Sequence, residues 1–114
     1  MSKPKVQIVI PVYNSAKYLR RCLDSLIEQT YPYWEAIMVN DASKDNSAEI
    51  MKEYQAKDDR IAVYNFEENL GVSKVRNFAL EKLSEKYTAF LDSDDFWEKD
   101  MLEVMVEKAE SENA

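Results

Sequence analysis

The clearest indication of the fold is the segment Val6-Gln7-Ile8-Val9-Ile10-Pro11-Val12, a short and nearly continuous apolar run rich in β-branched residues. A run of this kind is expected of a strand that is covered on both faces, as in a parallel sheet. Apolar residues at helical spacing come next, and Asn14 or Ser15 is placed to cap that helix. The stripe consists of Leu19, Cys22, Leu23, Leu26 and Ile27. The chain therefore opens with a strand followed by a helix.

The same alternation continues along the chain. Further strand patterns cover Ala36–Val39, Ile61–Phe66 and Tyr87–Leu91. Apolar residues at helical spacing follow each of these strands. They are Ile50, Met51 and Tyr54 after the second strand, and Val72, Val75, Ala79, Leu80 and Leu83 after the third. After the fourth strand they are Met101, Leu102, Met105, Val106 and Ala109. The order βαβαβαβα predicts an α/β fold, a Rossmann-like parallel sheet with helices on both faces. Right-handed crossovers and short connections favour the strand order 3-2-1-4.

Composition narrows the classes of function. The 114 residues favour a single domain over 1–114, and 15 basic against 22 acidic residues give a net charge of -7. That field repels the phosphates of nucleic acid, so no nucleic-acid partner is expected. The chain has no histidine and one cysteine, Cys22, which excludes an intramolecular disulfide and a Cys/His zinc site. Any metal must be held by oxygen, which points to magnesium, manganese or calcium.

Nothing in the sequence predicts a membrane segment. Met1 to Lys5 contain no apolar core of a signal peptide, and no apolar run is long enough to cross a bilayer. We therefore expect a cytoplasmic protein.

A binding site is expected where the winding of the sheet reverses. In open parallel sheets ligands bind beyond the carboxyl ends of the strands at this point, which for order 3-2-1-4 lies between the first and fourth strands. Residues Pro11 to Asn14 follow the first strand, Asp92 to Asp95 follow the fourth, and Asp41 follows the second. The predicted topology and the positions of these residues therefore indicate the same binding site, at the carboxyl ends of the first and fourth strands.

The acidic run supplies the first candidates. In extended backbone, Asp92 and Asp94 would point to one side and Ser93 to the other. Two carboxylates held close repel unless they share a proton or a cation. A divalent cation bound there would complete its shell with water and phosphate oxygens, and would stabilise a departing nucleoside diphosphate. The alternative, a solvated turn that caps the last helix, is equally compatible with the spacing.

Other candidates each have a structural alternative. Asp41 is near enough to a strand end to accept hydrogen bonds from a base, or belongs to the polar turn that starts the next helix. The ring of Tyr13 could pack on a base or cover the core. Arg76 could reach a phosphate or ribose, or be solvated. Gly71 is the only glycine and lies just before the third helix, where we expect a backbone conformation that glycine adopts more easily than other residues. No G-x-G-x-x-G follows the first strand, which argues against a dinucleotide site.

Taken together, these segments closely resemble glycosyltransferase family 2 over nearly the whole chain. The matching segments are Val9-Ile10-Pro11-Val12-Tyr13-Asn14, Leu19 to Leu26 with Gln29-Thr30-Tyr31-Pro32, Val39-Asn40-Asp41-Ala42-Ser43 with Asp45-Asn46-Ser47, Glu68-Asn69-Leu70-Gly71-Val72-Ser73 with Arg76-Asn77, and Phe90-Leu91-Asp92-Ser93-Asp94-Asp95. The last is similar to the family's D-x-D metal motif. Two departures affect loops: Asn40 stands where many members have aspartate, and Ala42 where glycine is frequent.

The resemblance implies the N-terminal half of a GT-A domain and inverting transfer of a sugar from a nucleoside-diphosphate donor, commonly a UDP-sugar. It assigns the nucleoside to Pro11, Tyr13 and Asp41, with Asp41 facing the base, and it puts Arg76 near the donor. Asp92 would lie near the ribose and the metal's waters. Asp94 would bind Mn²⁺ or Mg²⁺, and Asp95 is a secondary ligand.

The same resemblance sets expectations for the parent protein. Its general base lies beyond Ala114, so no catalytic base is assigned here and the chain is expected to be inactive alone. The acceptor is a saccharide or a lipid-linked acceptor of polysaccharide biosynthesis, and the parent associates with the inner face of a membrane.

Two alternatives remain. One is a non-catalytic interaction module, which would form a homodimer through the exposed edge of the fourth strand. The other is a phosphoacceptor domain, which needs a lysine after a fifth strand that the chain lacks.

Overall fold

A computed structural model describes residues 4–112, and its centre is a four-stranded parallel sheet. The strands are β1 (Val6–Val12), β2 (Trp34–Asn40), β3 (Ile61–Asn65) and β4 (Tyr87–Phe90), arranged in the order β3-β2-β1-β4. Both the α/β class and the strand order predicted from the sequence are confirmed. The two central strands, β1 and β2, are parallel over their full length, so that Val12 lies opposite Asn40 at the carboxyl edge.

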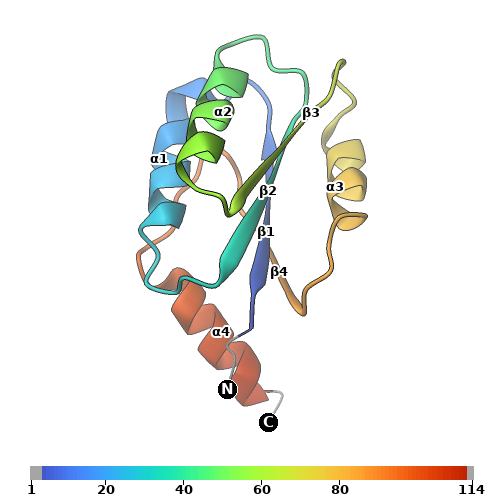
Figure 1. Ribbon diagram of the computed structural model, residues 1–114. Coiled ribbons are helices and arrows are strands. Elements are labelled where there is room, and N and C mark those ends of the chain that lie inside the picture. Colours follow the sequence, from blue (N-terminus) through green and yellow to red (C-terminus); the bar gives the residue numbers. More distant parts are fainter. Residues whose placement is uncertain (1–3, 113–114) are drawn as a thin grey trace.

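Helices cover both faces of the sheet, as the alternating pattern predicts. They are α1 (Ala16–Ile27), α2 (Ser47–Lys57), α3 (Val72–Leu80) and α4 (Met101–Glu112). In Figure 1, α1 and α2 lie on one face, α3 lies on the other, and α4 lies at the end where β1 starts. No helix within residues 4–112 is both long and apolar enough to cross a membrane.

The core has two unequal parts, separated by the sheet. On the larger side, Ile8 and Ile10 of β1 pack with side chains of α1, α2 and α4. On the α3 side, Val9 packs with a smaller group that includes Val75 and Ala79. Because alternate side chains of β1 enter opposite clusters, the strand needs apolar residues at consecutive positions. This explains the uninterrupted run that opens the sequence.

Two local features differ from the sequence-based expectations. Strand β2 begins at Trp34, two residues before the predicted Ala36, and the guanidinium of Arg60 stacks 3.8 Å from the centre of the Trp34 ring. Ser15 occupies the N-cap position of α1, but its side chain makes no capping hydrogen bond. The Ala16 N–H instead donates to the Asp45 carboxylate at 3.1 Å. The first turn of α1 is thus satisfied from the loop before α2 rather than from its own cap.

Candidate functional site

A cavity of about 620 Å³ opens at the carboxyl edge of the sheet, at the predicted switch point. Loops after β1, β2 and β4 and the start of α3 contribute to its wall. The lining residues that the sequence predicts are Pro11, Tyr13, Asp41, Asp92 and Asp94. The structure therefore brings together residues that lie up to 83 positions apart in the chain (Pro11 to Asp94).

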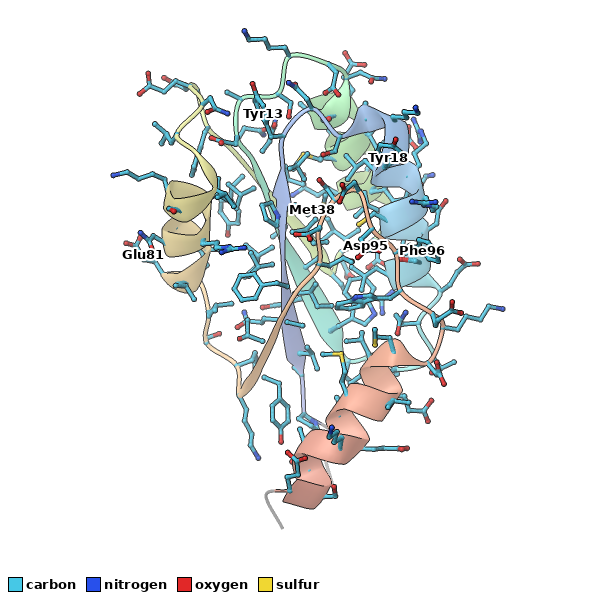
Figure 2. The ribbon with its side chains drawn as sticks, turned by 180° about the vertical axis from the view of Figure 1, so that it is seen from behind. Tyr13, Tyr18, Met38, Glu81, Asp95 and Phe96 are labelled. Atoms are coloured by element: carbon cyan, nitrogen blue, oxygen red, sulfur yellow. The ribbon has the colours of Figure 1, made fainter. Side chains whose placement is uncertain are left out.

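The β1–α1 loop forms part of the cavity wall. Tyr13 lies beyond the end of β1, where Figure 2 shows it among the strand-end loops, and 46% of its side chain is exposed. Asn14 has a φ of 50° and is held by the neighbouring β2–α2 loop: its N–H donates to Ser43 Oγ at 2.9 Å, and its Oδ1 accepts from the Lys44 N–H at 2.7 Å. The Tyr13 ring is thus an exposed flat surface carried on a braced loop, which suits stacking on a planar group.

Asp41 lines the cavity but is only 4% exposed, because the β3–α3 loop folds around it. Its Oδ1 accepts from the Leu70 N–H at 2.7 Å, and its Oδ2 accepts from the Gly71 N–H at 3.0 Å and from Asn69 Nδ2 at 3.1 Å. A carboxylate has about four acceptor positions, so these three bonds leave about one for a ligand. Asp41 therefore shapes the cavity wall in addition to facing into it.

Backbone conformation explains two residues beside this carboxylate. Gly71 has a φ of +91°, which residues with a Cβ rarely adopt, and its N–H points at Asp41. Ala42 has a φ of 59°, in the left-handed region that favours glycine. The position where the resembling family often has glycine is thus one where the backbone needs it, and this chain accepts the strain of an alanine there.

The acidic run is a turn, not the extended segment that we predicted. The Asp95 N–H donates to the Asp92 carbonyl at 3.0 Å, which closes a turn with Ser93 and Asp94 at its centre. Ser93 is buried, whereas Asp92 and Asp94 are exposed and both line the cavity. Both aspartates therefore reach the cavity with Ser93 buried between them, although the segment that carries them is a turn and not a strand.

These two carboxylates are free of internal donors. Within residues 4–112, no N–H or O–H donates to the side-chain oxygens of Asp92 or Asp94. The same part of the chain contains no group of three or more acids, histidines or cysteines placed to hold a metal. Two free carboxylates fit a divalent cation that takes its other ligands from water and from a bound phosphate group.

Two predicted site residues lie outside the cavity. Asp95 accepts a hydrogen bond from the Phe96 N–H at 2.8 Å, and Figure 2 shows both residues beside α1, away from Tyr13. Arg76 lies on α3 with its guanidinium 5.9 Å from the centre of the Phe90 ring. Neither residue is among those that line the cavity wall.

Cys22 supports the acidic turn from α1. Its Sγ donates to the Asp92 carbonyl at 3.6 Å, and Arg21 donates to the Asp94 carbonyl at 3.4 Å. Burial raises the pKa of the Cys22 thiol to about 12, and the negative charges of Asp95, Asp94 and Asp92 act in the same direction. The thiol therefore stays neutral and is not a nucleophile at neutral pH.

Sequence reasoning placed Val12 and Asn14 within its selected range but missed several other lining residues: Ser15, Tyr18, Asn69, Val72, Val75 and Ser93. Asn69 adjoins the only glycine, and that glycine was the available signal. Ser15 and Ser93 carried none, because a serine in a loop is usually solvated.

The site can be set beside known proteins. The sequence matches Glycosyl transferase family 2 over residues 7–114. The chain belongs to this family. It is 44% identical over 105 residues to TuaG of Bacillus subtilis (strain 168), a glycosyltransferase whose name refers to teichuronic acid biosynthesis, and it covers 42% of that protein. The chain thus spans less than half the length of this family relative.

Solved structures of glycosyltransferases share the fold. S. aureus TarS 1-349 in complex with UDP-GlcNAc superposes with a TM-score of 0.87 at 33% identity, over 94% of this chain and 31% of that one. The mannosyltransferase PcManGT from Pyrobaculum calidifontis, in complex with GDP-Man and Mn²⁺, superposes with a TM-score of 0.77 at 25% identity, over 85% of this chain and 29% of that one. A family 2 glycosyltransferase fold is therefore present in this chain.

Proposed function

We propose that the chain is the donor-binding part of a glycosyltransferase that transfers a sugar from a UDP-sugar to an acceptor hydroxyl, with inversion at the anomeric carbon. The observation that carries the proposal is a single cavity lined both by the exposed Tyr13 and by Asp92 and Asp94, whose carboxylates are free of internal donors. A base and a diphosphate need these two kinds of surface. The UDP-GlcNAc bound in the TarS structure supports the choice of donor class.

The five lining residues that the sequence predicts have separate roles in binding the donor. Pro11 and Tyr13 hold the nucleoside, and the remaining acceptor position of Asp41 takes a base N–H. Asp92 is directed to the ribose and to the waters of the cation, and Asp94 holds Mn²⁺ or Mg²⁺. Asp95 and Arg76 contribute only if the turn or α3 moves on binding, because both lie outside the cavity.

The cavity lining contains Asp41, Asp92 and Asp94 but no lysine or arginine. A diphosphate bound by these residues alone would be repelled. A bound divalent cation neutralises the diphosphate and stabilises the charge of the departing UDP. The two carboxylates supply hard oxygen ligands for it, and Tyr13 orients the other end of the nucleotide.

The chain alone is proposed to bind donor without transferring sugar. A base is needed to take the proton of the acceptor hydroxyl, and the resemblance assigns that base to residues beyond Ala114. The acceptor is proposed to be a saccharide or a lipid-linked saccharide, and the name of TuaG, which refers to teichuronic acid biosynthesis, supports this proposal.

Amide NMR of the chain, titrated with UDP and Mg²⁺, tests this function. We expect the signals of Tyr13, Asp41 and Asp94 to shift in a saturable manner, and Mn²⁺ in trace amounts to broaden Asp92 and Asp94 first. Uridine should shift Tyr13 and Asp41 while leaving Asp94 unmoved. If saturating UDP with Mg²⁺ moves none of the three signals, this chain does not bind a nucleotide donor.

A second candidate function, a self-associating interaction module, is favoured by the edge of the sheet. Strand β4 ends the sheet at one side, and the Phe90 side chain on it is exposed. Exposed strand edges with apolar side chains recruit other strands. Sedimentation of the chain at high concentration should then show a dimer that Phe90→Asp converts to monomer. A monomer at all concentrations would rule out this homodimer.

A further inference from the structure

Three buried serines from three different parts of the chain meet at the cavity, and two of them, Ser15 and Ser93, line it. Ser15 precedes α1, Ser47 begins α2 and Ser93 lies in the acidic turn, and they are 8%, 0% and 7% exposed. A buried hydroxyl costs free energy unless it is hydrogen-bonded, so each of the three requires a defined partner. The loops that they connect carry Tyr13 on one side and the acidic residues on the other.

Proton counting limits the directions of these hydrogen bonds. Ser15 Oγ donates to the Tyr13 carbonyl at 3.2 Å, which uses its only proton. Either hydroxyl can donate in the 2.5 Å contact between Ser15 Oγ and Ser93 Oγ, and Ser93 donates there when the Ser15 proton is directed to Tyr13. The Ser15 N–H donates in turn to Ser47 Oγ at 3.0 Å. Ser15 is thus the residue through which the acidic turn is joined to the Tyr13 loop and to α2.

The Ser93 hydroxyl also determines where its neighbours point. Because Ser93 is drawn inward by Ser15, the side chains of Asp92 and Asp94 are left on the outer side of the turn, in the cavity. The other contacts that hold the turn to α1 reach only backbone carbonyls. Of these bonds, the Ser15–Ser93 bond alone connects the turn to the loop that carries Tyr13.

We propose that Ser15 and Ser93 are positioning residues that set the spacing between the base-binding end and the cation-binding end of the cavity. The proposal rests on the proposed function, because only a ligand that occupies both ends responds to their spacing. UDP with a divalent cation is such a ligand. Uridine contacts the Tyr13 end alone, so its affinity does not depend on this bond.

The test compares Ser15→Ala, Ser93→Ala and the double variant with the unmodified chain by titration with UDP and Mg²⁺ and, separately, with uridine. We expect each single variant to bind UDP and Mg²⁺ about five- to tenfold more weakly, the effect of one lost hydrogen bond. Uridine affinity should stay within about twofold in Ser93→Ala, which keeps the hydrogen bond from Ser15 to the Tyr13 carbonyl. Because both residues share one bond, the double variant should be about as weak as the single variants.

Ser25→Ala is the matched control. Ser25 is also 8% exposed, and its hydroxyl donates to the Cys22 carbonyl at 2.7 Å and accepts from the Trp97 N–H at 3.1 Å, but it does not line the cavity. This variant loses a buried hydroxyl and its two bonds, as Ser15→Ala does, and should bind UDP with unchanged affinity. Ser93→Thr keeps the hydroxyl and should restore affinity to within about twofold.

The outcomes separate two failures. If the unmodified chain binds no UDP, the proposed function is wrong. If it binds UDP and the folded alanine variants bind equally well, or if uridine affinity falls by the same factor in Ser93→Ala, only the positioning role is wrong. Should an alanine variant not fold, Ser93→Cys replaces it, because cysteine keeps the side-chain shape and weakens the hydrogen bond.

Discussion

Asp41 lies at the same edge of the sheet as Asp92 and Asp94, but its environment is the opposite of theirs. Asp41 follows β2, is nearly inaccessible, and accepts three hydrogen bonds from residues 69–71. Asp92 and Asp94 follow β4 and are exposed, and their carboxylates accept no hydrogen bond from residues 4–112. The residue type and the fold position are alike, so the difference arises from the neighbouring loops.

The comparison shows how one sheet edge produces both a rigid wall and an open binding surface. A buried carboxylate must be satisfied by donors of the protein, and those donors then fix the loop that supplies them. An exposed carboxylate with no internal partner retains its full capacity for an external cation or donor. Stability is expected to depend on Asp41, and ligand affinity on Asp92 and Asp94.

Of the substitutions that test this difference, replacing Asp41 should have the largest effect on the free energy of unfolding. In Asp41→Ala the N–H groups of Leu70 and Gly71 lose their acceptor, and the Asn69 amide keeps only its hydrogen bond to the carbonyl of residue 41. We expect the free energy of unfolding to fall by about 2–4 kcal/mol, as for loss of a buried hydrogen-bonded charge. Urea unfolding followed by tryptophan fluorescence measures this. Asp94→Ala is the control, expected to change stability by less than about 0.5 kcal/mol. An equal loss in both variants would contradict the distinction.

Asp94→Asn should have the next largest effect, on binding rather than on folding. The amide keeps the shape of the side chain but removes the charge that attracts a cation. We expect the affinity for UDP with Mn²⁺ to fall about thirtyfold, or about 2 kcal/mol, as measured by calorimetric titration. Glu98→Gln, an exposed acid four residues further along the chain and outside the cavity, should bind as the unmodified chain does. Unchanged affinity in Asp94→Asn would exclude Asp94 from cation binding.

The fold could be predicted from the sequence because apolar periodicity is a local property of each segment and crossover handedness is a general rule of parallel sheets. Alternation of strand and helix patterns gave the order of elements, and crossover handedness gave the strand order. It also identified Pro11, Tyr13, Asp41, Asp92 and Asp94, because all are unusual residues at strand ends. Their cavity is where the switch-point argument expects it.

The remainder depends on contacts between distant loops, which periodicity does not encode. The bonds of Asp41 come from residues 28–30 positions away, and the partner of Ser93 is 78 positions away. The turn at Asp92–Asp95 was read as extended because its spacing resembles strand alternation. Arg76 was selected by resemblance, and the surface of α3 that carries it does not face the cavity.

Gly71→Ala tests how much the backbone conformation beside Asp41 contributes to stability. A Cβ at this position meets nothing within 4 Å, so the expected cost arises from its φ of +91° and not from a clash. We expect stability to fall by about 1–2 kcal/mol, measured by urea unfolding. The matched reverse change is Ala42→Gly, at a φ of 59°, which relieves strain and should be neutral or slightly stabilising. A destabilising Ala42→Gly together with a neutral Gly71→Ala would show that backbone strain is not the cause.

A fourth aspartate, Asp45, gives the smallest and most specific test. Asp45 is exposed like Asp94, yet its carboxylate accepts from the N–H groups of Ser47 at 2.9 Å and Ala16 at 3.1 Å. Desolvation opposes its charge, but hydrogen bonds from Ser47 and Ala16 outweigh that effect and lower the pKa of Asp45. It therefore combines the exposure of the acidic turn with the internal donors of Asp41.

The sign of its pH dependence follows from this lowered pKa. The folded state releases the Asp45 proton at lower pH than the unfolded chain does, so the stabilisation is complete above the unfolded pKa of about 3.9 and is lost as pH falls through the folded value. We expect Asp45→Asn to be less stable than the unmodified chain by about 0.3–0.5 kcal/mol at pH 6, a small effect because solvent screens the site. The difference should shrink below pH 4 in urea unfolding measured at several pH values. Since both proteins share every other acid, the difference isolates Asp45, and a constant difference from pH 6 to pH 3 would mean that its hydrogen bonds do not favour the charged form.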